Sequence, residues 1–369
     1  MTTDADVVLA VNSGSSSVKC ALFTFASEPQ LLARETMAGG PAEAWPRLLE
    51  WVTTHVRGRP VAGHRIVHGG PAYRDPHRIT PHVLEDLRNL VPFAPNHLPD
   101  EIALIEALQQ QAPDMPQIAC FDTAFHHTMP EVARRLPIPG AYDARGVRRY
   151  GFHGLSYAFL VEELERLTGP GQGSGRAIIA HLGNGSSLAA IRNGASVDTT
   201  MAFTPIAGIV MSTRTGDLDP GVVTYLARTE RASPDEVETM LSQRSGLIGI
   251  SGSTGDMQQL LAREHEDPAA RLAVASYVYG VVKAIGAFAA VLDGVETLVF
   301  SGGIGEHAAP VRARVCERLS HLGVAIDAAS NAAHAAVIST STSRVSVRVI
   351  PTNEELMIAR AAYRLLAPR

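Results

Sequence analysis

The sequence predicts an α/β protein built from two domains of the same kind. The chain has 369 residues, which is more than a single hydrophobic core usually serves. Apolar runs of strand length are followed by segments with helical spacing. A pattern of strand, small polar turn, strand, turn and strand occurs twice, near residues 7–37 and 176–200. This internal repeat predicts two like domains that each present one polar turn, and two such turns could grip a polyphosphate from both sides.

Composition narrows the class of protein. The chain is 46% hydrophobic and 19% charged, as is usual for a globular protein, and its formal net charge is −5 with no basic run. That balance argues against a nucleic-acid partner and against an anionic membrane. The apolar stretch 272–292 is interrupted by Lys283, so we expect a buried helix. The N-terminus lacks the apolar core of a signal peptide, and the three widely spaced cysteines predict reduced thiols in a cytoplasmic protein.

The first polar turn lies within residues 7–23. A β-branched run ends at Asn12, a Ser/Gly turn follows, and a second apolar run begins near Val18, so we expect two strands joined by a tight turn. Such a turn can direct backbone N–H groups and hydroxyls at one anion. The chain has only two lysines, and one of them, Lys19, directly follows this turn. A surface hairpin with an incidental lysine is the alternative, but the scarcity of lysine favours a phosphate site.

The next segments predict a strand at 31–37, a helix at 43–56 and a strand at 61–67 that runs into a glycine loop. In that strand, His64 and His68 lie on one face and Arg65 on the other. A metal site is disfavoured because no third ligand is near in sequence. Arg65 is either a salt-bridge residue or a clamp for an anion.

A proline-rich loop at 92–99 precedes a helix at 101–111 and a strand at 117–121 that ends at Asp122. A carboxylate at this end of a parallel strand commonly lies in a ligand crevice, although Asp122 could equally cap the next segment. An arginine-rich stretch then leads to His153 between glycines and to a helix at 156–167. Ser156 lies in a sequence that approximates a nucleophile elbow, but no strand closely precedes it, which disfavours a serine hydrolase.

The repeat then returns. We expect strands at 176–182, 188–192 and 195–200, with a polar turn at 183–187 and a hairpin at Asn193. The loop from Phe203 to Pro220 contains an arginine, hydroxyls and two carboxylates, and residues 245–256 are rich in glycine. Strands at 298–300 and 345–350 are predicted to precede helices, the first through the glycine loop 301–306 and a helix at about 310–322. The adjacent carboxylates Glu354 and Glu355 suit Mg²⁺ or a helix start.

Together these stretches resemble the acetate kinases, within the acetate and sugar kinase/Hsp70/actin superfamily. The resemblance runs from residue 7 to about 360 and is carried by the motifs NSGSSSVK, GHRIVHGG, FDTAFHHTMP, YGFHGLSY, HLGNGSS, FTPIAG, STRTGDLDP, SGGIGE and IPTNEEL. It implies two ribonuclease H-like (actin-like ATPase) α/β domains with a cleft between them. The N-terminal domain would span residues 1–150, completed by about 355–369, and the C-terminal nucleotide-binding domain would span 151–354.

The activity implied by the resemblance is reversible, Mg²⁺-dependent transfer of a phosphoryl group from ATP to acetate, giving acetyl phosphate and ADP by direct in-line transfer. The enzyme would be a phosphotransferase with a carboxyl acceptor and a cytoplasmic homodimer, with Mn²⁺ as an alternative metal. Two other interpretations stay open. One is a kinase for propionate or another short-chain carboxylate, and the other is a non-catalytic nucleotide switch of the actin/Hsp70 kind, which would not need Arg65, Arg214 and His153 together.

The resemblance also implies a role for individual residues. The catalytic set is Asn12, Arg65, Asp122, His153 and Arg214, with His153 and Arg214 as stabilisers of the transition state. The carboxylate substrate would contact Arg65, Val67, Phe152 and Pro205. The nucleotide and its phosphates would contact Ser15, Ser17, Lys19, His181, Asn184, Gly185, Asp256, Gly303, Ile304 and Gly305. The metal would be held by Asn12 and Glu354.

Two loops depart from the family pattern. The family sequence Ala-Pro-Leu-His-Asn-Pro appears here as residues 94–99 with Asn96 in the place of the leucine, which predicts a more polar acyl pocket. The family pattern Ser-x-Asp-Phe-Arg appears as residues 254–258, with Met257 and Gln258 at the aromatic and arginine positions. These departures predict a relaxed or altered range of acyl substrates or phosphoryl donors, which a strict preference for acetate and ATP would refute.

Overall fold

The computed structural model describes residues 6–14, 17–39, 41–55, 60–169 and 173–367. The chain forms two compact units. Unit 1 comprises residues 1–127, 152–159 and 353–369, and unit 2 comprises residues 128–151 and 160–352. Each unit contains one mixed β-sheet, and the two sheets share a strand plan.

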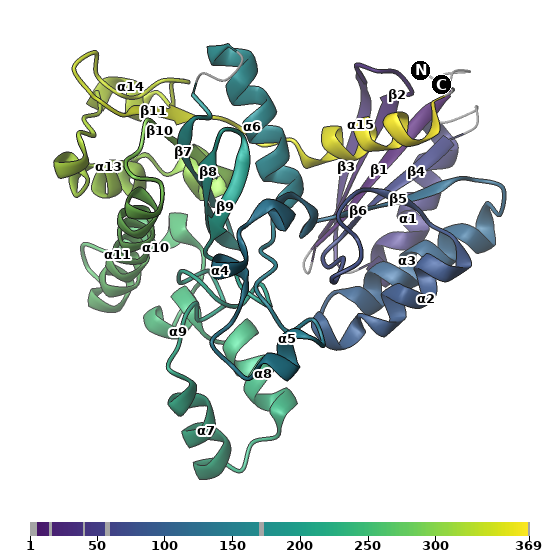
Figure 1. The fold of residues 1–369 in the computed structure, drawn as a ribbon, viewed down its shortest axis with the longest axis horizontal. Coiled ribbons are helices and arrows are strands. Elements are labelled where there is room, and N and C mark those ends of the chain that lie inside the picture. The colour runs from purple at the N-terminus through teal and green to yellow at the C-terminus, as the bar shows by residue number, and fades with distance from the viewer. Residues whose placement is uncertain (1–5, 15–16, 40, 56–59, 170–172, 368–369) are drawn as a thin grey trace. The chain divides into compact units, whose positions relative to one another are not determined.

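Unit 1 contains a six-stranded sheet with the order β3-β2-β1-β4-β6-β5 (Figure 1). Its strands are β1 (Val7–Ser13), β2 (Ser17–Thr24), β3 (Leu31–Ala38), β4 (Pro60–Ile66), β5 (His77–Arg78) and β6 (Gln117–Phe121). β1 pairs antiparallel with β2 and parallel with β4, and β4 pairs parallel with β6. The carboxyl ends of β1, β4 and β6 therefore meet at one edge, which is where Asn12, Arg65 and Asp122 lie.

Helices cover both faces of this sheet because alternate residues of β1 point to opposite sides. Its helices are α1 (Pro41–His55), α2 (Pro81–Asn89), α3 (Leu98–Gln111), α15 (Glu354–Leu366) and the start of α6 (Gly154–Thr168), with 3₁₀ turns η1 (Val91–Phe93) and η2 (Ala124–Thr128). Val8 and Ala10 pack with Ile358 of α15, whereas Leu9 and Val11 pack with Leu48 of α1. Figure 1 shows α15 on one side of the sheet and α1 and α3 on the other.

Unit 2 contains a five-stranded sheet with the order β11-β10-β7-β8-β9. Its strands are β7 (Arg176–Leu182), β8 (Ser186–Arg192), β9 (Ala195–Thr199), β10 (Thr297–Ser301) and β11 (Ser346–Val349). β7 pairs antiparallel with β8 and parallel with β10, which repeats the pairing of β1 with β2 and β4. Both sheets also have a register shift between the second and third strands. The repeat predicted from the sequence is confirmed.

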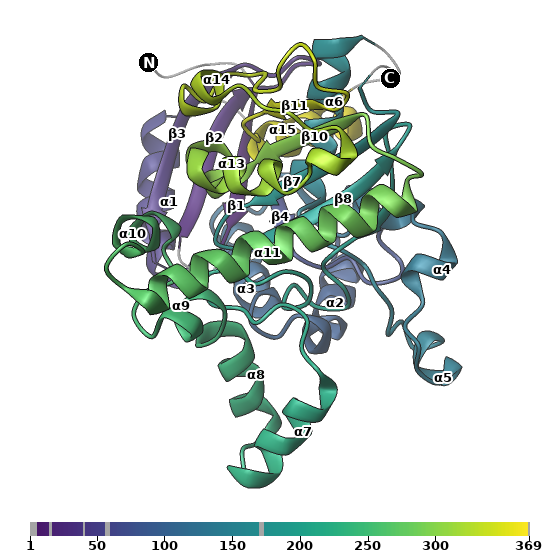
Figure 2. The same ribbon diagram turned by 90° about the vertical axis from the view of Figure 1, so that its left-hand side faces the viewer.

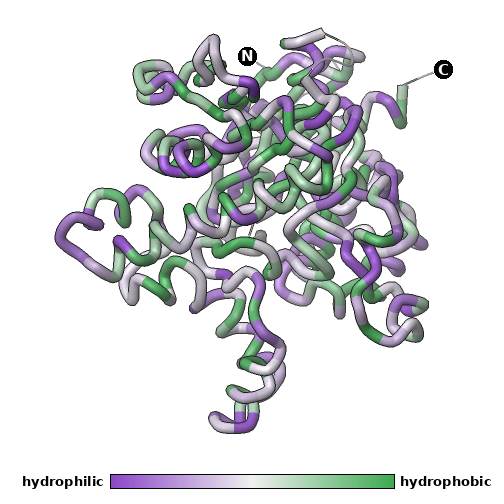
Figure 3. Tube along the Cα trace, turned by 60° about the vertical axis from the view of Figure 1, so that its left-hand side comes forward, coloured by the Kyte–Doolittle hydropathy of each residue, from purple (hydrophilic) through white to green (hydrophobic). Residues whose placement is uncertain are grey.

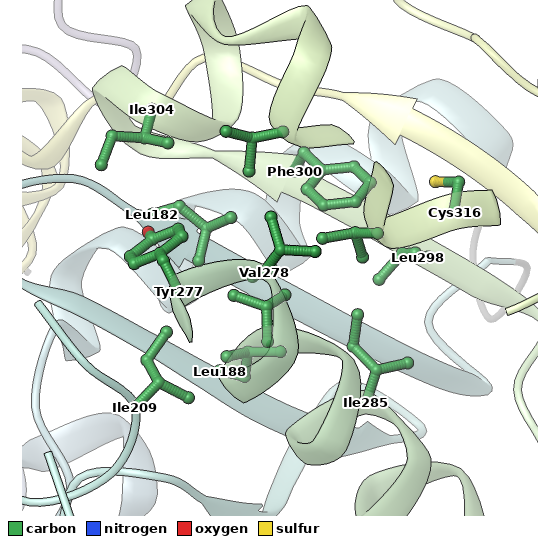
Figure 4. Close-up of a cluster of buried hydrophobic side chains, with 14 of the residues drawn as sticks. Leu182, Leu188, Ile209, Tyr277, Val278, Ile285, Leu298, Phe300, Ile304 and Cys316 are labelled. Carbon is green, nitrogen blue, oxygen red and sulfur yellow. The ribbon is translucent and has the colours of Figure 1, made fainter. Parts of the chain in front are cut away.

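The helices of unit 2 are α4 (Glu131–Arg134), α5 (Gly140–Asp143), α7 (Pro220–Thr229), α8 (Pro234–Gln243), α9 (Gly246–Ser251), α10 (Met257–Arg263), α11 (Pro268–Val291), α12 (Gly302–His307), α13 (Ala309–Glu317), α14 (Ala328–Ala332) and the 3₁₀ turn η3 (Ser320–Leu322). Of these, α9, α10 and α13 pack against the long helix α11. Figure 2 shows α11 lying along β7 and β8, and Figure 4 shows its Tyr277 and Val278 among Leu182 and Leu188 of the sheet.

Within the described residues, α11 is the one helix long and apolar enough to cross a membrane by length and composition. Its residues Ala273, Val274, Tyr277 and Val281 are fully buried in the core of unit 2. Hydrophilic residues interrupt the hydrophobic runs along the chain (Figure 3). One face of α11 is therefore buried, whereas Leu272 and Tyr279 are more than half exposed, so the burial predicted for 272–292 is confirmed only in part.

The break between the units differs from the boundary expected at residue 150. Arg149 donates from Nη1 to the carbonyl oxygens of Thr199 (2.9 Å) and Thr200 (3.2 Å). These bonds hold residues 128–151 on β9 of unit 2, so the first unit ends earlier than expected. The C-terminal return to unit 1 begins at Asn353, close to the expected 355.

Candidate active site

The β1–β2 hairpin places Asn12 and Lys19 directly opposite each other. Opposed residues of an antiparallel pair project to the same face, so the lysine and the amide belong to one surface. Asn12 is buried and Lys19 is exposed. Of the other residues predicted here, Ser15 and the side chain of Ser17 lie outside the described residues.

Asn12 binds two carboxylates from the opposite end of the chain. Its Nδ2 donates to Oε2 of Glu354 (2.8 Å) and to Oε1 of Glu355 (3.0 Å), which begin α15. The structure thus brings together Asn12 and Glu354, the two residues predicted to hold a metal. Glu355, which bonds to the same amide, is the second of the two adjacent carboxylates that the sequence indicated for Mg²⁺ or a helix start.

Arg65 and Asp122 form a charged pair at the ends of β4 and β6. Arg65 donates to Oδ2 of Asp122 from Nε (2.9 Å) and Nη2, and its Nη1 donates to the carbonyl oxygen of Ser13 (3.0 Å). Asp122 is fully buried. Burial lowers the pKa of Arg65, but Asp122, Glu354 and Glu101 together raise it further, so the guanidinium stays charged.

Two further features of Asp122 favour a role in ligand binding. Its Oδ1 is buried and has no hydrogen-bond partner among the described residues. Burial, with a smaller contribution from Glu354, raises the pKa of Asp122 to about 6, although Arg65 opposes that shift. A buried carboxylate with one unsatisfied oxygen is costly, and such groups are concentrated at functional sites.

His153 adjoins this pair through the backbone. It has φ of +59°, in the left-handed region that residues other than glycine seldom adopt. The next residue, Gly154, donates its N–H to the carbonyl oxygen of Asp122 (2.8 Å), and a Cβ there would lie 2.2 Å from that oxygen. Only glycine fits this approach, which holds the start of α6 and His153 against the end of β6.

The residues predicted to line the acyl pocket in unit 1 are buried. Val67 follows β4 and Phe152 precedes His153; each is nearly inaccessible. The rings of His68 and Phe152 meet edge to face, with centroids 5.6 Å apart. Val67 donates its N–H to Oε2 of Glu101 on α3 (3.0 Å), a buried contact that sequence reasoning missed because no motif marks it.

The donor set of unit 1 fits Mg²⁺. Asn12, Asp122, Glu354 and Glu355 offer amide and carboxylate oxygens, the ligands that this hard cation prefers. The unpaired, buried Oδ1 of Asp122 is an acceptor that a cation or its bound water would satisfy. Among the described residues, no group of three or more His, Cys, Asp or Glu side chains is placed to hold a metal ion.

In unit 2, the polar turn after β7 is tied to the loop that carries Arg214. The Asn184 carbonyl oxygen accepts from Ser212 N–H (3.2 Å), and its Oδ1 accepts from Ser212 Oγ (3.3 Å). Ser186 donates from Oγ to the carbonyl oxygen of Gly183 (2.8 Å) and closes the turn. Asn184 and Gly185, both predicted to contact phosphate, are thereby placed in one ordered turn. Ser212 is a supporting residue that the sequence did not single out.

Arg214 and Pro205, two of the predicted site residues, lie in contact in unit 2. Nη1 of Arg214 donates to the carbonyl oxygen of Pro205 (3.2 Å). The loop that holds Arg214 packs against Gly246, where a Cβ would lie 2.2 Å from Met211 O and 2.6 Å from Arg214 O. Gly246 also has φ of +65°, so both space and backbone conformation require glycine there.

The predicted glycine loop at 301–306 is instead a short helix, α12. Gly302 has φ of +74°, and a Cβ there would lie 2.7 Å from the Leu182 carbonyl oxygen. This close approach lets the chain enter a helix directly after β10, which the glycine-rich sequence did not predict. Gly303, Ile304 and Gly305 lie within this helix beside the end of β7.

Glu306 holds α12 in place. Its Oε1 accepts from the N–H of Gly302 (2.9 Å) and from the N–H of Thr352 (3.3 Å). The first of these bonds satisfies an N–H at the start of the helix, which has no partner inside the helix itself. The glycines of this motif drew attention in the sequence, whereas a role for Glu306 was not predicted.

Two other predicted nucleotide residues have structural contacts in unit 2. Asp256 caps α10 by accepting the Gln259 N–H at Oδ1 (2.9 Å). His181 is half-buried near the end of β7, in register with Ser187 of β8 and Ser301 of β10. Neither contact excludes a ligand. Gly255 packs on Ser212, so the Asp256 segment and the Asn184 turn share a neighbour.

The remaining motifs have structural explanations. His64 pairs with Gln117, and His68 Nδ1 accepts the Gly70 N–H, so the two histidines do not share a ligand. Ser156 is fully buried in the first turn of α6, unlike the exposed serine of a nucleophile elbow. Asp217 and Asp219, the carboxylates of the Arg214 loop, accept backbone N–H groups within their own segment.

Comparison with known proteins gives one consistent result. The model of the acetokinase family matches residues 52–360. An acetate kinase from Rhodopseudomonas palustris is 42% identical, covering 98% of both chains, and one from Micrococcus luteus is 41% identical, covering 97% of this chain and 99% of that one. Among solved structures, an acetate kinase from Porphyromonas gingivalis has a TM-score of 0.86 at 32% identity, and the match covers 98% of this chain and 100% of that one. A propionate kinase from Francisella tularensis has a TM-score of 0.87 at 32% identity, and the match covers 96% of this chain and 98% of that one.

Proposed function

Because this chain belongs to the acetokinase family, we propose that it transfers the terminal phosphoryl group of ATP to a short-chain carboxylate, with acetate as the principal acceptor. The observation that carries the proposal is the pair of Arg65 and buried Asp122 beside Asn12 and Glu354. A guanidinium held in place at the end of a sheet, next to oxygen ligands for a cation, is suited to bringing together two anions.

The chemistry needs no general base. A carboxylic acid has a pKa of about 4, so the acceptor is already ionised at neutral pH. The protein must overcome the repulsion between this carboxylate and the polyphosphate, and must stabilise the charge on the phosphoryl group during transfer. Fixed cationic and hydrogen-bonding groups supply both effects.

On the acceptor side, Arg65 binds the carboxylate and Asp122 keeps its guanidinium in a fixed orientation. Two hydrogen bonds to one carboxylate oxygen and a third to Ser13 leave the arginine little freedom. Val67 and Phe152 bind the acyl group. His153 donates a hydrogen bond to the phosphoryl group, at the place set by the contact between Gly154 and Asp122.

On the nucleotide side, the turn at Asn184 and Gly185 binds the phosphates, and α12 with Gly303 and Ile304 contacts the nucleoside. Arg214 stabilises the phosphoryl group in the transition state. Asn12 and Glu354 hold Mg²⁺, which when bound contributes positive charge against the phosphate oxygens. Lys19, on the same face as Asn12, adds a mobile cation to this region.

The test is an acyl-hydroxamate assay on the purified full-length protein with Mg²⁺. Acetate, propionate and butyrate are each combined with ATP, GTP and pyrophosphate. The expected result is acyl phosphate from acetate and ATP. The absence of acyl phosphate from every pair would contradict the proposal and favour a nucleotide switch.

The same assay addresses the acyl range. The similarity to a propionate kinase favours turnover of propionate as well as acetate. A strict preference for acetate and ATP would refute the altered range predicted from residues 94–99 and 254–258. The homodimer expected from the family stays a prediction, and analytical ultracentrifugation of the purified protein checks it.

A further inference from the structure

Glu101 is a buried carboxyl group to which no step of the proposed reaction assigns a role. It lies in the first turns of α3 and is 3% exposed. Its Oε2 accepts the Val67 N–H at 3.0 Å, and its Oε1 is buried without a hydrogen-bond partner among the described residues. Carboxyl groups are seldom buried this deeply, because removing them from water is costly unless a specific contact compensates.

Glu101 connects two segments of the acceptor side. Val67 directly follows β4, the strand that carries Arg65. The other segment is the loop at 94–97, which contains Asn96 and leads into α3; Leu98 N–H donates to Ala94 O (3.0 Å) and Glu101 N–H to His97 O (3.2 Å). The side chain therefore binds one segment while the backbone of the same residue binds the other.

The electrostatic surroundings of Glu101 link it to substrate binding. The charged groups that act on its carboxyl group are Arg65 from β4, Asp122 from the end of β6 and Asp100 from its own helix. Burial raises the pKa of Glu101 to about 8, although Arg65 and the Val67 N–H oppose that shift. Glu101 is then neutral at pH 7, and ionisation above pH 8 places a negative charge near the guanidinium that binds the carboxylate.

We infer that Glu101 is a positioning residue of the acceptor side, which fixes the Val67 N–H and so sets the end of β4 against the loop that carries Asn96. It acts through Arg65 and Val67 and sets the affinity for the carboxylate. The inference rests on the proposed function, because that function defines Val67 and Arg65 as the acceptor residues.

The experiment compares Glu101→Leu, Glu101→Gln and the wild type. Leucine removes the acceptor for the Val67 N–H, whereas glutamine keeps an acceptor of the same size and cannot ionise. Glu106→Gln is the matched control, because Glu106 lies on the same helix in an exposed ion pair with Arg88. KM for acetate and for ATP, kcat from pH 6 to 9.5, and hydrogen exchange of the Val67 amide are measured on each protein.

The expected result separates the two substrates. Glu101→Leu raises KM for acetate about tenfold or more, which corresponds to about 1.4 kcal/mol, and leaves KM for ATP within about twofold. Glu101→Gln has near wild-type KM at pH 7 but lacks the decline in kcat/KM for acetate that the wild type shows above pH 8. The Val67 amide exchanges faster in the leucine variant only, and Glu106→Gln behaves as wild type.

Three results would overturn the inference. The first is an unchanged KM for acetate in the leucine variant, and the second is an equal rise in both KM values, which would indicate general disruption. The third is an alkaline decline that persists in Glu101→Gln, a test that stands even if the leucine variant does not fold. A wild-type protein that makes no acyl phosphate would contradict the proposed function instead, and the Val67 exchange rates would still decide whether Glu101 holds that amide.

Discussion

At the scale of single residues, two arginines separate the proposed kinase from a protein that only binds nucleotides. Arg65→Ala and Arg214→Ala are each expected to lower kcat by about 10³, because an arginine can contribute that much to a phosphoryl transition state. Initial rates at saturating acetate and ATP measure the effect. Arg88→Ala and Arg176→Ala are the controls, since both arginines form exposed ion pairs. A kcat near normal in both site variants would remove this mechanism.

Gly303 offers a residue-scale test of the nucleotide site. A Cβ there would meet nothing within 4 Å, so the fold itself does not require glycine. Gly303→Ala is expected to raise KM for ATP by about tenfold or more, because the methyl group would occupy space that the nucleoside needs. Thermal unfolding should be unchanged or slightly more resistant, since alanine favours helix.

The control for this substitution is Gly286→Ala in α11, which is also helical and also open around the added Cβ. It should leave both KM values unchanged. An unaltered KM for ATP in Gly303→Ala would show that the nucleoside does not lie on that segment of α12.

At the scale of elements, the contact between β4 and β6 predicts a pH dependence of stability. His64 of β4 donates from Nε2 to Oε1 of Gln117 on β6 (2.7 Å), because the Gln117 amide nitrogen donates to Ile105 O. Burial lowers the pKa of His64 to about 4 from its usual 6.5, although the bond to Gln117 opposes this. A lowered pKa means that His64 contributes stability above pH 6.5 that is lost as the pH falls towards 4.

Replacement of this histidine should therefore flatten the pH profile. Between pH 7 and pH 4.5, the wild type is expected to lose about 2 kcal/mol more unfolding free energy than His64→Gln. Urea unfolding at both pH values measures the difference. His82→Gln on α2 is the control, because His82 is exposed. Equal losses in the wild type and His64→Gln would show that His64 is not buried in its neutral form.

At the scale of the whole molecule, the three cysteines report on the two cores. Cys20 and Cys120 are buried in unit 1 and Cys316 in unit 2, and burial raises the pKa of each thiol to about 12. None should react with iodoacetamide in the native protein at pH 8 within minutes, because the thiolate is the reactive form. Mass spectrometry after pulse labelling across a urea series gives the midpoint for each cysteine.

Cys20 and Cys120 should become labelled at the same urea concentration, since both belong to the sheet of unit 1. The midpoint for Cys316 then measures the stability of unit 2 by itself. Rapid labelling of any thiol in the absence of urea, or separate midpoints for Cys20 and Cys120, would contradict the description of the cores.

Many of the strands and helices could be predicted from the sequence because local residue patterns determine them. The strands at 117–121 and 176–182 have the predicted bounds, and the hairpin at Asn193 has the positive φ that its Asn-Gly sequence predicts. The local sequence pattern gave a wrong prediction at α12, because the glycine-rich residues 301–306 were expected to form a loop. A helix forms there because Gly302 adopts a positive φ close to Leu182, and sequence alone does not show that contact.

The sequence by itself determined the family and the repeated strand plan, and its motifs supplied nearly all of the candidate site residues, because these depend on residue types in short, local motifs. Only the tertiary structure decided which of them meet. Asn12 and Glu354 are 342 positions apart, and they bind because β1 and the start of α15 pack in one unit. Asp122 acquires a raised pKa and an unpaired oxygen only through burial, and Glu101 meets Val67 only when α3 packs beside β4. Such long-range contacts depend on the packing of whole elements, which no short stretch of sequence encodes.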